Sequence, residues 1–184
     1  MTKELGIAIS ELHSAIAAID PAEIDTACSA IATARRVVLY GCGREGLQLR
    51  GLAMRLHHLG REVAMHGDMA APPVSAGDLF VASAGPGELS TVTDLMRVAR
   101  EAGANILFMT AEPQTPSAAL ATWVLTIPAQ TMARDRMPGA SRILPMESVY
   151  EGALFLLFEI MILKLREQLG VTPEAMRANH TNLE

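Results

Sequence analysis

Cysteine is scarce in this chain, which holds only Cys28 and Cys42, without the spacing of a disulfide framework. The N-terminal residues Met1 to Leu5 also lack the apolar core of a secretory signal peptide. Secreted disulfide-bonded proteins usually have both a regular cysteine spacing and a signal peptide with an apolar core. We therefore expect a cytoplasmic protein whose two thiols stay reduced.

Long apolar runs are lacking as well. The most apolar stretch, Ala153 to Leu163, is interrupted by Glu159 and followed by charged residues from Lys164 onward. A helix needs about 20 apolar residues to cross a bilayer, so this stretch is too short to do so. A helix that is apolar on nearly all sides is better covered by a second subunit, which predicts a homo-oligomer.

The third absence is a basic stripe. The net charge is −5, and the Lys and Arg residues are scattered along the chain. Nucleic acids and anionic membranes bind to clustered positive charge, so both are poor candidate partners. The composition instead favours a small molecule as the partner.

The 184 residues are 50% hydrophobic, which is enough for the core of one domain spanning 1–184. Helical spacing of apolar residues predicts N-terminal helices within 1–35 and C-terminal helices within 145–184. The sheet core spans 36–128, with predicted strands at 37–40, 63–65, 78–82, 105–110 and 123–127 and with helices that include 47–59 and 89–102. This alternation predicts an α/β protein, a three-layer sandwich of the flavodoxin-like, doubly wound type with parallel strands.

Two glycine-rich turns follow the first and third predicted strands, Gly41 to Gly46 and Gly85 to Ser90. Turns of this kind at helix N-termini bind anions. The first turn also fits the G-x-G-x-x-G spacing of dinucleotide-binding domains, with Asp68 about 20 residues further on. The second turn fits such a domain poorly, so a dinucleotide site is the less favoured alternative.

Further short segments follow in a characteristic order: Ala53-Met54-Arg55-Leu56, His58-Leu59-Gly60, Gly77-Asp78-Leu79, Pro145-Met146, Tyr150-Glu151, and a final His180 with Leu183-Glu184. Together with the two turns they cover nearly the whole chain. In this order and spacing the chain resembles the sugar isomerase (SIS) domain family, most of all the 6-phospho-3-hexuloisomerases.

The resemblance implies dimers or tetramers with active sites shared between subunits, and the isomerisation of a phosphorylated sugar. It implies that Glu151 is the catalytic glutamate, that His180 is a catalytic histidine presented to a neighbouring subunit, and that Arg55 lies near the substrate. No cofactor and no metal are required by such a reaction.

These residue types suit the chemistry. A carboxylate can remove a proton beside a carbonyl and return it to the adjacent carbon through a cis-enediol. His180 can move a proton between the sugar oxygens or open the ring, and Arg55 can stabilise an enediolate. Burial is expected to raise the pKa of Glu151 and the helix dipole to lower it, and the sequence does not decide between them.

The phosphate-binding positions depart from the family pattern. Where the family has hydroxyl side chains, this chain has Glu45, Ala84, Pro86 and Leu89. Pro86 also lacks an N–H donor, and Glu45 brings a negative charge toward a phosphate. The sequence therefore predicts an altered phosphate site and a substrate that is unphosphorylated or carries another group, such as a cationic one.

A second acidic residue, Glu147, replaces a glycine that the family usually has after Pro-Met. Glu147 and Glu151 are four residues apart on one helix, so they face the same way and each disfavours the other's charge. The predicted substrate-binding residues are Gly43, Arg44, Glu45, Arg55, Ser83, Gly85, Gly87, Glu88, Ser90, Glu147 and Ser148.

Three of these residues also have a purely structural interpretation. Glu45 can simply cap the helix that begins near it, Glu151 can be a carboxylate favoured by a helix start, and His180 can be a solvated terminal residue. The acidic residues and His180 lack the spacing of a metal motif, so no metal is predicted. The alternative function is a non-catalytic module that binds a sugar or sugar phosphate.

Overall fold

Five parallel strands form the centre of the structure, a computed structural model that describes residues 2–183. Met1 and Glu184, the last residue of the C-terminal motif, lie outside the described residues. The strands are β1 (Val37–Gly41), β2 (Val63–Met65), β3 (Leu79–Ser83), β4 (Asn105–Thr110) and β5 (Trp123–Thr126), in the spatial order β2-β1-β3-β4-β5. All four neighbouring pairs are parallel, which confirms the predicted α/β class.

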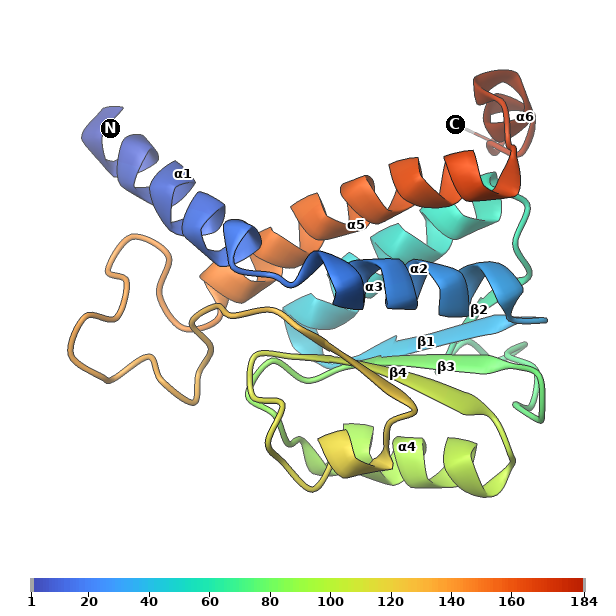
Figure 1. Ribbon diagram of the computed structural model, residues 1–184, viewed down its shortest axis with the longest axis horizontal. Coiled ribbons are helices and arrows are strands. Elements are labelled where there is room, and N and C mark those ends of the chain that lie inside the picture. Colours follow the sequence, from blue (N-terminus) through green and yellow to red (C-terminus); the bar gives the residue numbers. More distant parts are fainter. Residues whose placement is uncertain (1, 184) are drawn as a thin grey trace.

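Helices cover both faces of this sheet (Figure 1). One face carries α2 (Pro21–Thr33), α3 (Gly43–His58) and α5 (Ser148–Leu169), and the other carries α4 (Ser90–Glu101) and the short 3-10 helix η1 (Ala118–Leu120). The N-terminal helix α1 (Thr2–Ala17) packs against α5, and the short α6 (Pro173–Ala178) packs against α3. The predicted three-layer sandwich is therefore confirmed.

The strands bury both of their faces, as parallel strands between helix layers do. Neighbouring residues point to opposite sides: Leu39 packs under α3 and α5, whereas Val38 packs with Phe80 and Met96 on the α4 side. Two apolar cores therefore lie on either side of one sheet. They hold the strand ends, and the turns that follow them, in fixed positions.

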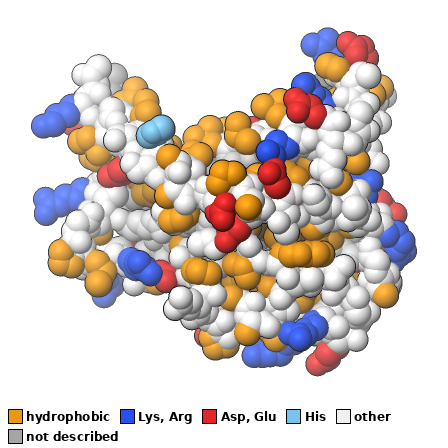
Figure 2. All heavy atoms as spheres, viewed as in Figure 1, with side chains coloured by type: hydrophobic (Ala, Val, Ile, Leu, Met, Phe, Trp, Pro, Cys, Tyr) orange, Lys and Arg blue, Asp and Glu red, His pale blue; other side chains and the backbone are white. Residues whose placement is uncertain are grey.

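The outer side of α5 remains open in this chain. Its large exposed apolar side chains are Phe155, Leu156, Ile160 and Leu163, while Leu5 and Ile9 are exposed on α1. Among residues 2–183, no helix has both the length and the apolar character needed to cross a membrane. On the face drawn in Figure 2, basic and acidic side chains are interspersed, and hydrophobic side chains reach the surface between them.

Two helices begin at residues other than those predicted. The helix predicted from 47 begins at Gly43, where a positive φ of 54° lets the chain turn directly into α3. The long helix at the start of the predicted segment 145–184 begins at Ser148, because Met146 has a φ of 61°, which is not helical. The first glycine turn is therefore shorter and closer to its helix than the sequence indicated.

The two glycine turns meet at the point where the strand order reverses. β1 and β3 are neighbours, with Gly41 paired with Ser83 at their carboxyl ends, but α3 leaves on one face and α4 on the other. In doubly wound proteins, ligands bind in the crevice that this reversal opens. The topology thus assigns the site to the ends of β1 and β3.

The first turn depends on a close backbone contact. A Cβ added at Gly46 would lie 2.4 Å from the carbonyl oxygen of Gly41, which is backbone and cannot move aside. We expect Gly46→Ala to lower the free energy of unfolding by about 1–3 kcal/mol, as overpacking does. The matched control is Gly51→Ala on the same helix, where nothing lies within 4 Å and the greater helix propensity of alanine should stabilise the protein. Urea unfolding measures both, and equal effects of the two substitutions would contradict this packing.

Candidate active site

Glu45 connects the two glycine turns. It lies in the first turn of α3 and is only 2% exposed. Its carboxylate accepts the backbone N–H of Gly85 at 3.0 Å and the hydroxyl of Ser83. The side chain thus reaches across to the second turn instead of capping its own helix, and it uses two donors of that turn.

Tyr150 completes this buried network and was missed from the sequence. It is fully buried in the first turn of α5, with its hydroxyl 3.2 Å from the Ser83 oxygen. Because Ser83 gives its only proton to Glu45, Tyr150 donates to Ser83. Burial holds the pKa of Tyr150 well above its usual value, so it keeps that proton. A tyrosine inside an apolar helix next to Glu151 was the available signal, since a buried hydroxyl needs a partner.

Glu147 lies just before α5 and presses onto the second turn. A Cβ at Gly85 would come within 2.4 Å of the Glu147 Oε1 atom, so only glycine fits beneath this carboxyl. Oε1 is buried and receives no N–H or O–H donor from residues 2–183. The Glu147 carboxyl also lies near that of Glu45, whose charge raises the pKa of Glu147.

Glu151 follows one helical turn later and is 6% exposed. The guanidinium of Arg44 lies over it, with Nε 3.1 Å from a carboxylate oxygen, and also donates to the Ser148 hydroxyl at 3.1 Å. Arg44 is itself half exposed, so it stands between the buried carboxylates and solvent. The predicted residues Arg44, Glu45, Ser83, Gly85, Glu147, Ser148 and Glu151 are thus brought together.

Burial dominates the electrostatics of the three carboxyl groups. It raises the pKa of Glu151 more than the nearby Arg44 charge lowers it. Burial also raises the pKa of Glu45 against its hydrogen bonds from Ser83 and Gly85. The pKa of Glu147 rises to about 7, through burial first and then through the charges of Glu45 and Glu151. Near neutral pH the cluster therefore holds a proton that it can exchange.

The other predicted residues of the turns lie at the rim. Gly87 has a φ of 91°, and a Cβ there would come within 2.7 Å of Glu112 and Thr115. Glu88, Ser90 and Gly43 are exposed to solvent, with Ser90 at the first position of α4. Backbone N–H groups at such a helix start can hold an anion.

His180 and Arg55 are not brought to this cluster within one chain. His180 follows α6 and stacks on His58, with ring centroids 5.1 Å apart, beyond the far end of the 22-residue α5. That helix is about 33 Å long at 1.5 Å per residue. Arg55 forms a bidentate ion pair with Glu159, at 3.1 and 3.2 Å, two turns of α5 beyond Glu151.

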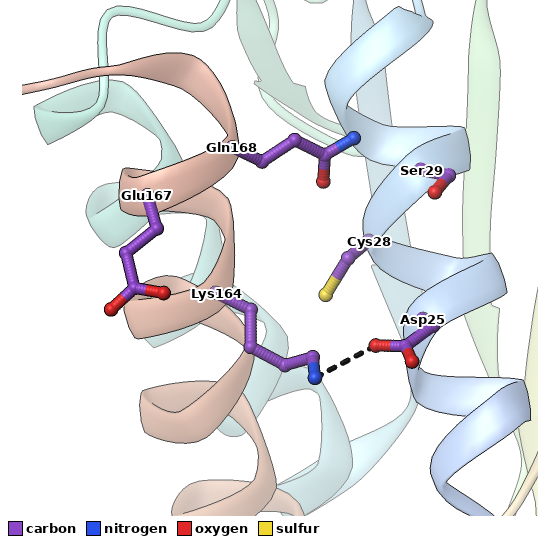
Figure 3. Close-up of a pocket in the computed structure, with 6 residues that line it drawn as sticks. All are labelled: Asp25, Cys28, Ser29, Lys164, Glu167 and Gln168. Atoms are coloured by element: carbon purple, nitrogen blue, oxygen red, sulfur yellow. Dashed lines mark ion pairs between the residues drawn. The ribbon is translucent and has the colours of Figure 1, made fainter.

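A separate hollow of about 480 Å³ lies between α2 and α5, away from Glu151 (Figure 3). Lys164 points across it to Asp25 at 2.7 Å, while Cys28 is buried beside them. Burial raises the pKa of the Cys28 thiol to about 11, so it is not a nucleophile at neutral pH. Among residues 2–183, no group of three or more His, Cys, Asp or Glu side chains is arranged to hold a metal ion.

A doubly wound sheet with carboxyl groups and a glycine turn at its switch point is the arrangement of a protein that binds a small molecule in that crevice. The SIS domain model matches residues 30–153, and the chain belongs to this family. The predicted family is thereby confirmed.

Among its relatives are proteins named 3-hexulose-6-phosphate isomerase. One from Methylomonas aminofaciens is 35% identical and covers 100% of both chains, and one from Mycobacterium gastri is 35% identical over 100% of this chain and 92% of its own. A crystal structure of a Methanococcus jannaschii protein, for which that function was inferred, has a TM-score of 0.85, 22% identity and 99% coverage of both chains. The first two relatives confirm the predicted enzyme class, isomerase, and the third confirms the fold.

Proposed function

We propose that this protein isomerises a sugar by moving a carbonyl between adjacent carbons through a cis-enediol, with Glu151 as the base. The observation that carries the proposal is the Glu151 carboxyl itself, buried on a rigid helix at the switch point of the sheet. Burial raises its pKa, which makes it a stronger base than a solvated glutamate. Relatives named as isomerases of a hexulose phosphate over the whole chain support the same reaction.

Arg44 is the residue best placed to stabilise the intermediate. Its guanidinium lies 3.1 Å from Glu151, so a substrate carbon next to the base has its oxygen within reach of this charge. The sequence resemblance gave this role to Arg55, but Arg55 is held by Glu159 in a single chain. We therefore propose that Arg44 stabilises the negative charge on the enediolate oxygen. Contact of Arg55 with the substrate stays a prediction.

The finer proposal concerns the substrate's phosphate. A sugar phosphate is the class that the relatives support, yet Glu45 already takes the Gly85 N–H and the Ser83 hydroxyl. A phosphate at this turn would meet a buried carboxyl and would compete for the same donors. We propose that the substrate is an unphosphorylated ketose, or one whose other group, hydroxylated or cationic, faces Glu45.

His180 requires a second copy in this proposal. It lies beyond the far end of α5 from Glu151, and the exposed apolar side chains of α1 and α5 offer a surface for self-association. We propose that an oligomer presents His180 of one copy to the site of another. There its imidazole would open the sugar ring.

The base is tested by solvent deuterium exchange at the carbons beside the carbonyl, across a panel of phosphorylated and free ketoses. We expect the wild type to exchange and isomerise at least one of them, and Glu151→Gln to lose both by about 10²-fold or more. The matched control is Glu167→Gln, an exposed carboxylate on the same helix, which should keep full activity. Binding without exchange in the wild type would instead support the non-catalytic sugar-binding module.

The phosphate site is tested by calorimetric titration with inorganic phosphate. Glu45→Ser frees the Gly85 N–H and removes a buried negative charge, so we expect phosphate to bind about tenfold more tightly than to the wild type. Glu101→Ser removes an equal charge at the end of α4 and serves as the control. Tight binding of phosphate to the wild type would exclude an altered site.

Self-association is tested by light scattering. We expect a dimer or tetramer that Ile160→Asp dissociates, because a charge cannot be buried there without a partner. Val98→Asp, at a similarly exposed position on α4, should leave the assembly intact. A wild type that is monomeric at assay concentrations would remove His180 from the mechanism.

A further inference from the structure

An isomerisation through a cis-enediol moves two protons. One passes between adjacent carbons, and Glu151 carries it in the proposed function. The other must pass from the hydroxyl oxygen to the former carbonyl oxygen. In the proposed function His180 of a second copy opens the sugar ring, which leaves this second transfer to a group on the chain that carries Glu151.

Glu147 has the position for it. It lies one helical turn before Glu151, so the two carboxyl groups project from neighbouring places on one side of α5. Its Oε1 atom is buried against Gly85 and receives no donor from the described residues. A buried carboxyl oxygen without a donor disfavours the charged form of its carboxyl, so this packing favours Glu147 in its protonated form.

The chemistry of a carboxyl group matches the task. A protonated carboxyl donates its proton and, once ionised, accepts another, so the group can serve two adjacent substrate oxygens in turn. Burial and the charge of Glu45 raise the pKa of Glu147, which favours a proton on Glu147 in the absence of substrate. That proton is one turn of helix away from the base.

We propose that Glu147 is a catalytic residue that transfers the proton between the two substrate oxygens. This inference rests on the proposed function. Glu151 takes the proton from the hydroxyl-bearing carbon, and Glu147 gives its own proton to the carbonyl oxygen. Glu147 then takes the proton from the neighbouring hydroxyl, and Glu151 returns its proton to the former carbonyl carbon. Both carboxyl groups end as they began.

The surroundings fit a group that gains and loses a proton near neutrality. Glu147 faces the carboxyl groups of Glu45 from α3 and Glu151 from α5, and the Arg44 charge lies beyond them. Burial and the two carboxylates raise the pKa of Glu147 to about 7, and Arg44 opposes them. The reaction needs Glu147 protonated and Glu151 ionised. Its rate therefore falls as pH rises through about 7, and falls again at low pH as Glu151 takes up a proton.

The test compares isomerisation with deuterium exchange into recovered substrate in Glu147→Gln. We expect isomerisation to fall about 10²-fold, the contribution of a general acid-base group, with exchange reduced less. The ratio of exchange to isomerisation should rise about tenfold, because the enediolate still forms but returns to substrate. The alkaline fall of the rate should also disappear, and Glu147→Asp should restore part of the activity.

Other outcomes separate the two proposals. If Glu147→Gln isomerises at the wild-type rate, or loses exchange and isomerisation in equal proportion while Glu147→Asp restores nothing, Glu147 is not the transfer group. Glu147→Gly, which carries the glycine usual in the family, repeats the measurement should glutamine disturb folding. If the wild type neither exchanges nor isomerises, or if Glu151→Gln still exchanges, the proposed function itself is wrong.

Discussion

The site depends on one contact, the buried carboxylate of Glu45 with the N–H of Gly85 and the hydroxyl of Ser83. It ties the turn after β1 to the turn after β3, which are far apart in sequence and adjacent only because their strands pair. A buried carboxylate is tolerated where strong donors meet it, and here a backbone amide and a serine backed by Tyr150 do so. The remaining carboxyl groups take their positions around this contact.

The same contact sets the charge of the site. With Glu45 fixed in the turn, Glu147 approaches Gly85 and Glu151 follows on α5, so three acidic groups share a confined space. Arg44 balances part of this charge from the solvent side. Like charges held together in a poorly solvated place raise each other's pKa, which is how a carboxyl can act as an acid near neutral pH.

The fold followed closely from the sequence because parallel strands buried on both faces are short apolar runs with clear ends. The strands at 63–65 and 105–110 match their predicted bounds. The start of α3 was misplaced because a glycine run was interpreted as loop, whereas Gly43 turns the chain and begins the helix there. The interpretation of Glu45 as a cap of its own helix considered only neighbouring residues. It was wrong because the Glu45 side chain hydrogen-bonds to Ser83 and Gly85, in a turn that is far away in the sequence.

Most residues of the site could be predicted from the sequence, but the sequence did not show which of them lie together. Glu147 immediately precedes α5 and Glu151 lies in its first turn, so the spacing of four residues was enough to predict that they are close. The positions of Arg55 and His180 depend on the pairing with Glu159 and on the length of α5, which no local motif encodes. Tyr150 was not predicted because it acts through its hydrogen bond to Ser83, and only the structure shows that contact.

The fit of Glu147 over Gly85 couples positions 45 and 147. With a small hydroxyl residue at position 45, Glu147 would still occupy the space above the turn. With glycine at position 147, Glu45 would still hold the donors of the turn. Either substitution alone therefore leaves one carboxyl in the turn, and only the pair of substitutions removes both.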